Sequence, residues 1–298
     1  MSVPSVAHES VSTMILPWLP PGRTIVLAGR GEFFYRHHQH PDPDAPTVLL
    51  LHGWTASADL QFFAAYPALA EVCSFVAIDH RGHGRSARPS GRFELEDVAE
   101  DAALLVTHLG LGPVTVVGYS MGGPLTMLLT RQHPELVDGI VLQATALEWR
   151  ETLLERVRWK TVRLLGPVVR SWAFPSWLRA GLRRMSSARP ELAQYVEWLA
   201  GEVSRSDALH LVHAGQALSR YDARPWAASI DKRASVLVTT GDHLVKPWKQ
   251  RRLASSLRAQ MVDIRADHLA TWMLPDEYAR LTVQQVLSVS AFVAGLIE

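Results

Sequence analysis

The sequence has a single cysteine, no leader-like start and no long apolar run. Because Cys73 is alone, no disulfide can form within the chain. Residues 1–22 contain neither Lys nor Arg, and their apolar stretch is short and broken by prolines. Both features argue against a secretory signal. No apolar run is long enough to span a membrane. We therefore expect a cytoplasmic location.

The chain also lacks an excess of charge of one sign. Its formal net charge is +1 at pH 7, so the overall balance indicates no nucleic-acid partner. The 298 residues are 48% hydrophobic, which is enough for one large core or for a core with an inserted subdomain.

Short apolar runs that predict buried strands alternate with segments whose apolar residues recur at helical spacing. The first two runs predict a hairpin over 23–38 that turns at Gly29-Arg30-Gly31. Further strands are expected at 47–51, 74–79, 114–118, 139–144, 234–242 and 259–268, and helices at 94–109, 121–132 and 276–297. This alternation predicts an α/β fold with a mostly parallel β-sheet flanked by helices.

The alternation stops between residues 146 and 230, where helical patterns occur without a convincing strand. The simplest arrangement is a core formed by residues 23–145 and 231–298, with residues 146–230 inserted as a helical cap. Residues 1–22, rich in Ser and Pro, are expected to form an N-terminal arm.

Ser120 stands in the segment "VVGYSMGG", where an apolar strand pattern gives way to a helical one. Gly118 and Gly122 flank it, which suits a sharp turn that lifts the serine hydroxyl clear of the backbone. A serine becomes a nucleophile when a neighbouring base takes its proton, and the following helix directs free N–H groups at developing negative charge. The alternative is that Ser120 only caps this helix.

Three other segments favour the nucleophile. "LLLHGW" places His52, Gly53 and Trp54 after a buried strand, where a glycine lets backbone N–H groups approach a substrate. Asp242 follows the strand of "VTTGDHLVKP", and His268 follows the last strand in "DIRADHLATW". The order is therefore Ser, Asp, His, each near the carboxyl end of a strand, which is the edge where open parallel sheets bind ligands.

Together with "IDHRGHGRS" (78–86), these segments resemble the α/β-hydrolase fold superfamily, in its serine-nucleophile branch with a helical cap that includes esterases, lipases and perhydrolases. The resemblance covers about residues 23–145 and 232–297. It implies that the DHRGHGRS segment is a structural loop, in which Arg81 and Arg85 support the scaffold. Epoxide hydrolases and haloalkane dehalogenases of this fold use an aspartate nucleophile, so Ser120 points to acyl transfer instead.

Carried onto this sequence, the resemblance makes Ser120 the nucleophile, His268 the general base and acid, and Asp242 the residue that orients the imidazole. The backbone N–H groups of Trp54 and Met121 would form the oxyanion hole. Glu148, one strand earlier than Asp242, is the rival acid. The residues expected to support these motifs are His52, Gly53, Gly118 and Gly122.

The activity that the resemblance implies is hydrolysis of a carboxylic ester with an apolar acyl or aryl part, through an acyl-enzyme and without cofactor or metal. The same triad serves thioesterases, perhydrolases, C–C bond hydrolases and acyltransferases, and some members of the fold only bind a lipid or another ligand. No sequence feature separates the enzymatic alternatives, whereas the presence of candidates for all three triad members argues against a member that only binds. The oligomeric state is also open.

Two basic clusters invite other interpretations. Residues 150–184 hold nine Lys or Arg against two acids, a local net charge of +7, with Trp, Leu and Val between them. This pattern suits peripheral contact with an anionic membrane, or else a cap with solvated arginines. The histidines of "HHQH" (37–40) lack a partner at metal-binding spacing, so no metal site is expected.

Overall fold

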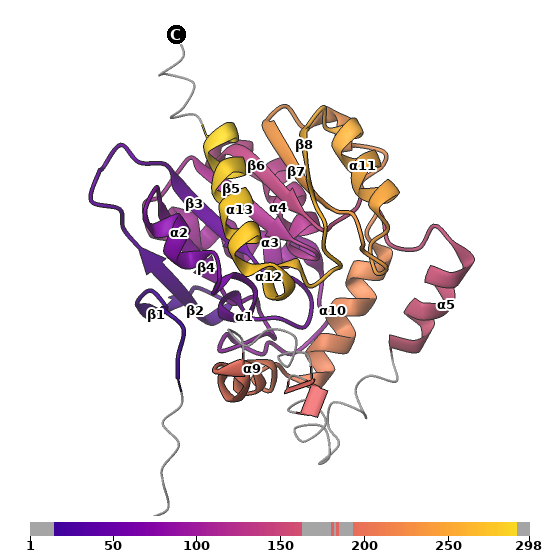
Figure 1. Cartoon of the computed structure of the whole chain (residues 1–298), viewed down its shortest axis with the longest axis horizontal. Helices are drawn as coiled ribbons and strands as arrows, with labels where there is room; N and C mark the ends of the chain where they lie inside the picture. Colours follow the sequence, from indigo (N-terminus) through magenta and orange to yellow (C-terminus); the bar gives the residue numbers. More distant parts are fainter. Residues whose placement is uncertain (1–14, 163–179, 182, 185–192, 291–298) are drawn as a thin grey trace, which may run out of the picture.

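The computed structural model describes residues 15–162, 180–181, 183–184 and 193–290 (Figure 1). Eight strands form one sheet in the order β1-β2-β4-β3-β5-β6-β7-β8. The strands are β1 (Gly22–Leu27), β2 (Gly31–His38), β3 (Thr47–Leu51), β4 (Ser74–Ile78), β5 (Val114–Tyr119), β6 (Val137–Gln143), β7 (Arg233–Thr239) and β8 (Gln260–Ile264).

The predicted mostly parallel sheet is confirmed, because neighbouring strands pair in parallel throughout the series β4-β3-β5-β6-β7-β8. The expected hairpin is also present, since β1 pairs antiparallel with β2. β2 then pairs antiparallel with β4, so the hairpin forms one edge of the sheet. Each predicted strand lies within a few residues of an observed one.

Helices cover both faces of the sheet. Alternation along β3 places Leu49 and Leu51 in one core, while Val48 and Leu50 face the other core. The first core packs under α3 and α4, and the second packs under α2 and α13. The helices of the core are α1 (Ala58–Phe62), α2 (Tyr66–Ala70), α3 (Leu95–His108), α4 (Gly122–Gln132), α11 (Pro247–Ser256), α12 (Ala270–Met273) and α13 (Pro275–Val289), with 3-10 turns at Pro134–Leu136 and Ala227–Ser229.

The chain between β6 and β7 is helical over most of its described part. It contains α5 (Leu153–Thr161), α9 (Val196–Val203) and α10 (Ala208–Arg220). In Figure 1, α9 lies below α1, α10 lies to its right, and α5 lies at the far right. Its only described strand-like pairing is a bridge between Glu148 and Asp222.

Several sequence predictions extend beyond the described residues. They are the first 14 residues of the arm, much of the basic segment beyond residue 162, and the end of the predicted helix 276–297 beyond residue 290. The boundaries of arm, core and cap stay predictions. The described helices include none that is both long and apolar enough to cross a membrane.

Buried ion pairs attach the helices between β6 and β7 to the core. Glu202 of α9 accepts a hydrogen bond from Ser57 Oγ at 3.1 Å and pairs with Arg85. At the other end of the segment, Lys249 of α11 lies 2.8 Å from Glu148 Oε1 and 2.7 Å from Glu155 Oε1. The Lys249 side chain is 2% exposed, so its charge depends on these carboxylates for solvation.

Replacing Lys249 by methionine tests this attachment. Lys249→Met keeps the length of the side chain but leaves two carboxylates without their shared cation, and we expect a loss of about 3 kcal/mol in unfolding free energy. The matched control is Lys246→Met at a nearby exposed position, for which we expect a change within about 0.5 kcal/mol. Urea denaturation measures both variants, and equal effects would contradict the role given to Lys249.

Candidate active site

Ser120 lies between β5 and α4 with a backbone φ of +53°, in the left-handed region that non-glycine residues rarely adopt. The turn is tight, because a Cβ at Gly118 would overlap the carbonyl oxygen of Gly122, and a Cβ at Gly122 would overlap that of Leu51. The glycines therefore allow α4 to start directly against β5 and β3. The Ser120 side chain is held at the carboxyl edge of the sheet as a result.

His268 lies in the loop between β8 and α12, and its Nε2 atom is 2.9 Å from Ser120 Oγ. The hydroxyl of Tyr119 donates to the carbonyl oxygen of His268 at 2.9 Å, which ties this loop to the strand that precedes the serine. The structure therefore brings the predicted nucleophile and the predicted base into hydrogen-bonding contact.

Asp242 orients the histidine from the loop after β7. Its Oδ2 atom is 2.7 Å from His268 Nδ1, and because an ionised carboxylate only accepts, Nδ1 carries the proton. Nε2 is then free to accept the hydroxyl proton of Ser120. The backbone N–H groups of Leu244 and Val245 donate to Asp242 Oδ1 at 2.7 and 2.8 Å, so the carboxylate has little freedom to rotate.

The environment of Asp242 favours its charged form. Burial alone raises the pKa of this carboxyl, but the hydrogen bond and charge of His268 lower it, as do the hydrogen bonds from Val245 and Thr239. The net pKa lies below the ordinary value for aspartate. Gln250 Nε2 also lies 3.3 Å from Oδ2. Sequence reasoning missed both contacts, because Thr239 was taken only as part of the strand pattern in "VTTGDHLVKP" and Gln250 lies outside the motifs.

The rival acid, Glu148, is placed elsewhere. Its carboxylate pairs with Lys249 at 2.8 Å and with Arg252 at 3.0 Å, and it makes no described contact with His268. Asp267 is also unsuited to the role of the acid, since its Oδ1 accepts the backbone N–H of Leu269 at 2.8 Å. Among the candidate carboxylates, the geometry selects Asp242.

The loop after β3 runs beside Ser120. A Cβ built on Gly53 would lie 3.2 Å from the Cβ of Ser120, so only glycine gives this approach without a shift. The N–H groups of Trp54 and Met121 donate no hydrogen bond to another backbone group in the described part of the chain. Both amides belong to the two segments that meet at Ser120, where an oxyanion hole requires them.

His52 orients this loop through a hydrogen bond with its own neighbour. Its Nε2 accepts the backbone N–H of His80 at 3.0 Å, so the ring proton is on Nδ1, which donates to the Gly53 carbonyl at 2.8 Å. In a trans peptide the C=O and the N–H point in opposite directions. By holding the Gly53 carbonyl, His52 therefore sets the direction of the Trp54 N–H.

His80 and His83 complete a buried group of three histidines around this loop. The ring centroids of His52 and His80 are 3.9 Å apart, and His83 Nδ1 lies 3.0 Å from the Arg81 carbonyl oxygen. Burial lowers the pKa of His80 to about 3 and that of His83 to about 4, so both rings are neutral near pH 7. The sequence indicated a structural loop here but not its contact with His52.

Two of the histidines at 37–40 contact backbone carbonyl oxygens. His38 Nε2 lies 3.2 Å from the Ala70 carbonyl oxygen, and His40 Nε2 lies 3.3 Å from that of Glu71. Across the described ranges, no group of three or more His, Cys, Asp or Glu side chains is arranged to hold a metal ion.

Comparisons with known proteins agree on one family. A family model described as "alpha/beta hydrolase fold" matches residues 46–272. A soluble epoxide hydrolase from Corynebacterium sp. is 33% identical over 108 residues, which are 36% of this chain and 37% of that protein. The 3-oxoadipate enol-lactonase 2 of Acinetobacter baylyi is 29% identical over 168 residues, which are 56% of this chain and 60% of that protein.

Among solved structures, an esterase from Exiguobacterium antarcticum aligns with a TM-score of 0.76 at 18% identity, covering 90% of this chain and 100% of that one. This likeness concerns the fold. The two relatives matched by sequence are covered over 37% and 60% of their own lengths, so their activities are not transferred by the match itself.

The buried histidines predict how stability depends on pH. Because the pKa of His83 is lowered from 6.5 to about 4, the unfolded chain binds a proton that the folded chain does not, and stability falls as the pH drops below 6.5. Between pH 7 and pH 5 one such histidine costs about 2 kcal/mol. The amide of His83→Asn can still donate to the Arg81 carbonyl but does not titrate. We therefore expect this variant to lose about 2 kcal/mol less unfolding free energy between pH 7 and pH 5 than the parent protein does.

Urea denaturation at the two pH values measures the difference. His108→Asn, at an exposed position near the end of α3, is the control and should leave the fall unchanged. An identical pH dependence in His83→Asn and the parent protein would contradict the buried neutral state of His83.

The geometry also predicts the reactivity of Ser120 with a fluorophosphonate. In Asp242→Asn the amide favours the wrong histidine tautomer, and we expect the labelling rate to fall by roughly 10³- to 10⁴-fold. Asp267→Asn is the matched control and should label within a few-fold of the parent protein. Mass spectrometry locates the label. A similar loss in Asp267→Asn or Glu148→Gln would contradict the assignment of Asp242.

Proposed function

Because this chain belongs to the alpha/beta hydrolase fold family, we propose that it cleaves a carboxylic ester through an acyl-serine intermediate. The observation that carries the proposal is the continuous hydrogen-bonded series from Ser120 Oγ through His268 to Asp242, with distances of 2.9 and 2.7 Å. This is the arrangement that activates a serine hydroxyl at neutral pH.

In the first half of the reaction, Ser120 Oγ attacks the carbonyl carbon of the ester while its proton moves to His268 Nε2. The resulting imidazolium is stabilised by Asp242, which stays ionised because its pKa is low. As the tetrahedral intermediate collapses, the bond to the alkoxy group breaks and Nε2 returns the proton to the leaving alcohol. The acyl group remains on Ser120.

In the second half, water replaces the alcohol. His268 Nε2 takes a proton from the water as it attacks the acyl carbon, and then gives that proton to Ser120 Oγ when the acid leaves. The N–H groups of Trp54 and Met121 would hold the carbonyl oxygen in both halves. Each such donor contributes about 3–4 kcal/mol, because the negative charge develops only in the transition state.

The identity of the nucleophile favours an ester over an epoxide. A serine that opened an epoxide would form an alkyl ether, which has no carbonyl for water to attack, and the enzyme would be trapped. A serine that is acylated by an ester or by a lactone, which is a cyclic ester, is released by water. The names of the enol-lactonase relative and of the structurally similar esterase agree with this chemistry.

The acyl or aryl part of the substrate is proposed to be apolar. Trp54 directly follows Gly53, which lies against Ser120. The centroid of the Trp54 ring lies 5.6 Å from that of Trp159. Ligand pockets are mostly apolar with a few placed polar groups, which suits these aromatic neighbours. Thioesters, peracids, C–C bonds and acyl transfer to other acceptors use the same triad, so substrate trials have to separate them.

Hydrolysis of p-nitrophenyl esters from acetyl to palmitoyl tests the proposal. We expect turnover that falls by at least about 10⁴-fold in Ser120→Ala, because the acyl-enzyme cannot form. The chain length with the highest kcat/KM then gives the size of the acyl pocket. Ser255→Ala, an exposed serine on α11, is the matched control and should keep full activity.

Two outcomes would contradict an esterase. Equal turnover by the parent protein and Ser120→Ala would show that the triad does not act on these esters. Absence of turnover on every ester, in a protein whose Ser120 still labels with a fluorophosphonate, would favour another acyl derivative or a C–C bond as the substrate.

A further inference from the structure

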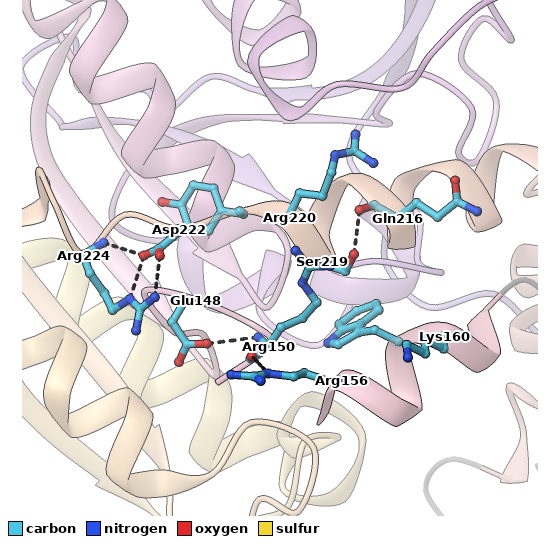
Figure 2. A pocket seen from close by; sticks show the side chains of 11 residues that line it. Glu148, Arg150, Arg156, Lys160, Gln216, Ser219, Arg220, Asp222 and Arg224 are labelled. Atoms are coloured by element: carbon cyan, nitrogen blue, oxygen red, sulfur yellow. Dashed lines mark hydrogen bonds and ion pairs between the residues drawn. The ribbon is translucent and has the colours of Figure 1, made fainter. Parts of the chain in front are cut away.

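A pocket apart from the triad lies between α5, α10 and the loop that follows β6 (Figure 2). Its volume is about 900 Å³, which is within the range of small-molecule sites. None of its lining residues belongs to the triad or to the proposed oxyanion hole. Two backbone contacts fix the chain beneath it, since Glu148 bridges to Asp222 and the N–H of Ala223 donates to the Leu147 carbonyl at 2.8 Å.

Basic side chains dominate the rim of this pocket. They are Arg150, Arg156, Lys160, Arg220 and Arg224, and the acids that line it are Glu148 and Asp222. Both acids are already neutralised, because Asp222 binds Arg224 through two side-chain hydrogen bonds and Glu148 pairs with Lys249 and Arg252.

Three of the cations are not neutralised in the described part of the chain. Arg156 donates only to the carbonyl oxygens of Arg150 and Glu151, and neither Arg150 nor Lys160 has a described carboxylate partner. Arg220, by contrast, pairs with Glu94 outside the pocket. Figure 2 shows the Arg156 side chain against the backbone of Arg150, with Lys160 farther along α5.

The spacing along α5 explains why two of these cations line the same pocket. Trp159 and Lys160 follow Arg156 by three and four residues, so both lie on the same face of the helix as Arg156. That face is turned toward the pocket, which all three residues line. Trp159 is mostly buried and donates its indole N–H to the Trp149 carbonyl at 2.6 Å, so its ring offers the pocket an apolar surface.

We infer that this pocket binds a small molecule with at least two phosphate or carboxylate groups, at Arg150, Arg156 and Lys160. Guanidinium groups bind both kinds of oxyanion through paired hydrogen bonds, and two negative groups match the excess of positive charge. The site is independent of the proposed ester hydrolysis. If the inference is correct, this part of the basic 150–184 segment binds a soluble ligand and not a membrane surface, because its cations line a pocket.

Isothermal titration of the full-length protein with pyrophosphate, and separately with citrate, tests the site at low salt. We expect at least one of the two anions to bind, with an affinity that falls as sodium chloride screens the exposed charges. The anion that binds more tightly shows whether the natural ligand carries phosphate or carboxylate. Ser120→Ala should bind as the parent protein does, which keeps this result separate from catalysis.

The double variant Arg150→Glu with Lys160→Glu should weaken binding at least roughly tenfold, since it replaces two cations with repelling charges. The matched control, Arg23→Glu with Lys232→Glu, changes the net charge equally but lies outside the pocket and should bind normally. Thermal denaturation checks that both variants are folded.

Equal weakening in the two double variants would assign the effect to net charge and overturn the site. Failure of the parent protein to bind either anion would overturn it as well. Binding to phosphatidylglycerol vesicles without binding of the free anions would assign these cations to a membrane surface instead.

Discussion

The geometry of the proposed active site depends on one close backbone approach, in which Gly122 at the start of α4 packs against the carbonyl of Leu51 at the end of β3. This contact places the loop of His52, Gly53 and Trp54 directly beside Ser120. Ser120 itself has a left-handed backbone conformation, which costs on the order of 1–3 kcal/mol for a non-glycine residue. The packing of α4 against β3 and β5, together with the hydrogen bond from the Ser120 N–H to the Gln143 carbonyl, maintains that conformation.

Burial has two different consequences for the ionisable groups around this turn. His52, His80 and His83 are buried among one another and stay neutral, so they serve as fixed hydrogen-bond partners. Asp242 is also buried, but it accepts several hydrogen bonds and stays charged. The site therefore combines neutral histidines beside the proposed oxyanion hole with a buried negative charge behind His268.

The helices between β6 and β7 combine firm attachment with an open basic surface. Glu202 and Lys249 connect the helical segment to the core through buried ion pairs. Arg150, Arg156 and Lys160, by contrast, remain exposed around the pocket between α5 and α10. Trp159 lines this pocket, and the centroid of its ring lies 5.6 Å from that of Trp54, which belongs to the loop beside Ser120.

Local patterns in the chain were enough to predict the succession of strands and helices, the parallel α/β class and the candidacy of Ser120 and His268, because hydrophobic periodicity and glycine spacing can be read along the sequence. The choice between Asp242 and Glu148 required the folded chain, because both follow a strand in the sequence. Only the structure shows that Asp242 contacts the His268 imidazole while Glu148 pairs with Lys249 and Arg252. The contact of His52 with His80 and the position of Arg150 and Lys160 around one pocket emerged in the same way. The backbone brings separate elements together in space, and no local pattern encodes that arrangement.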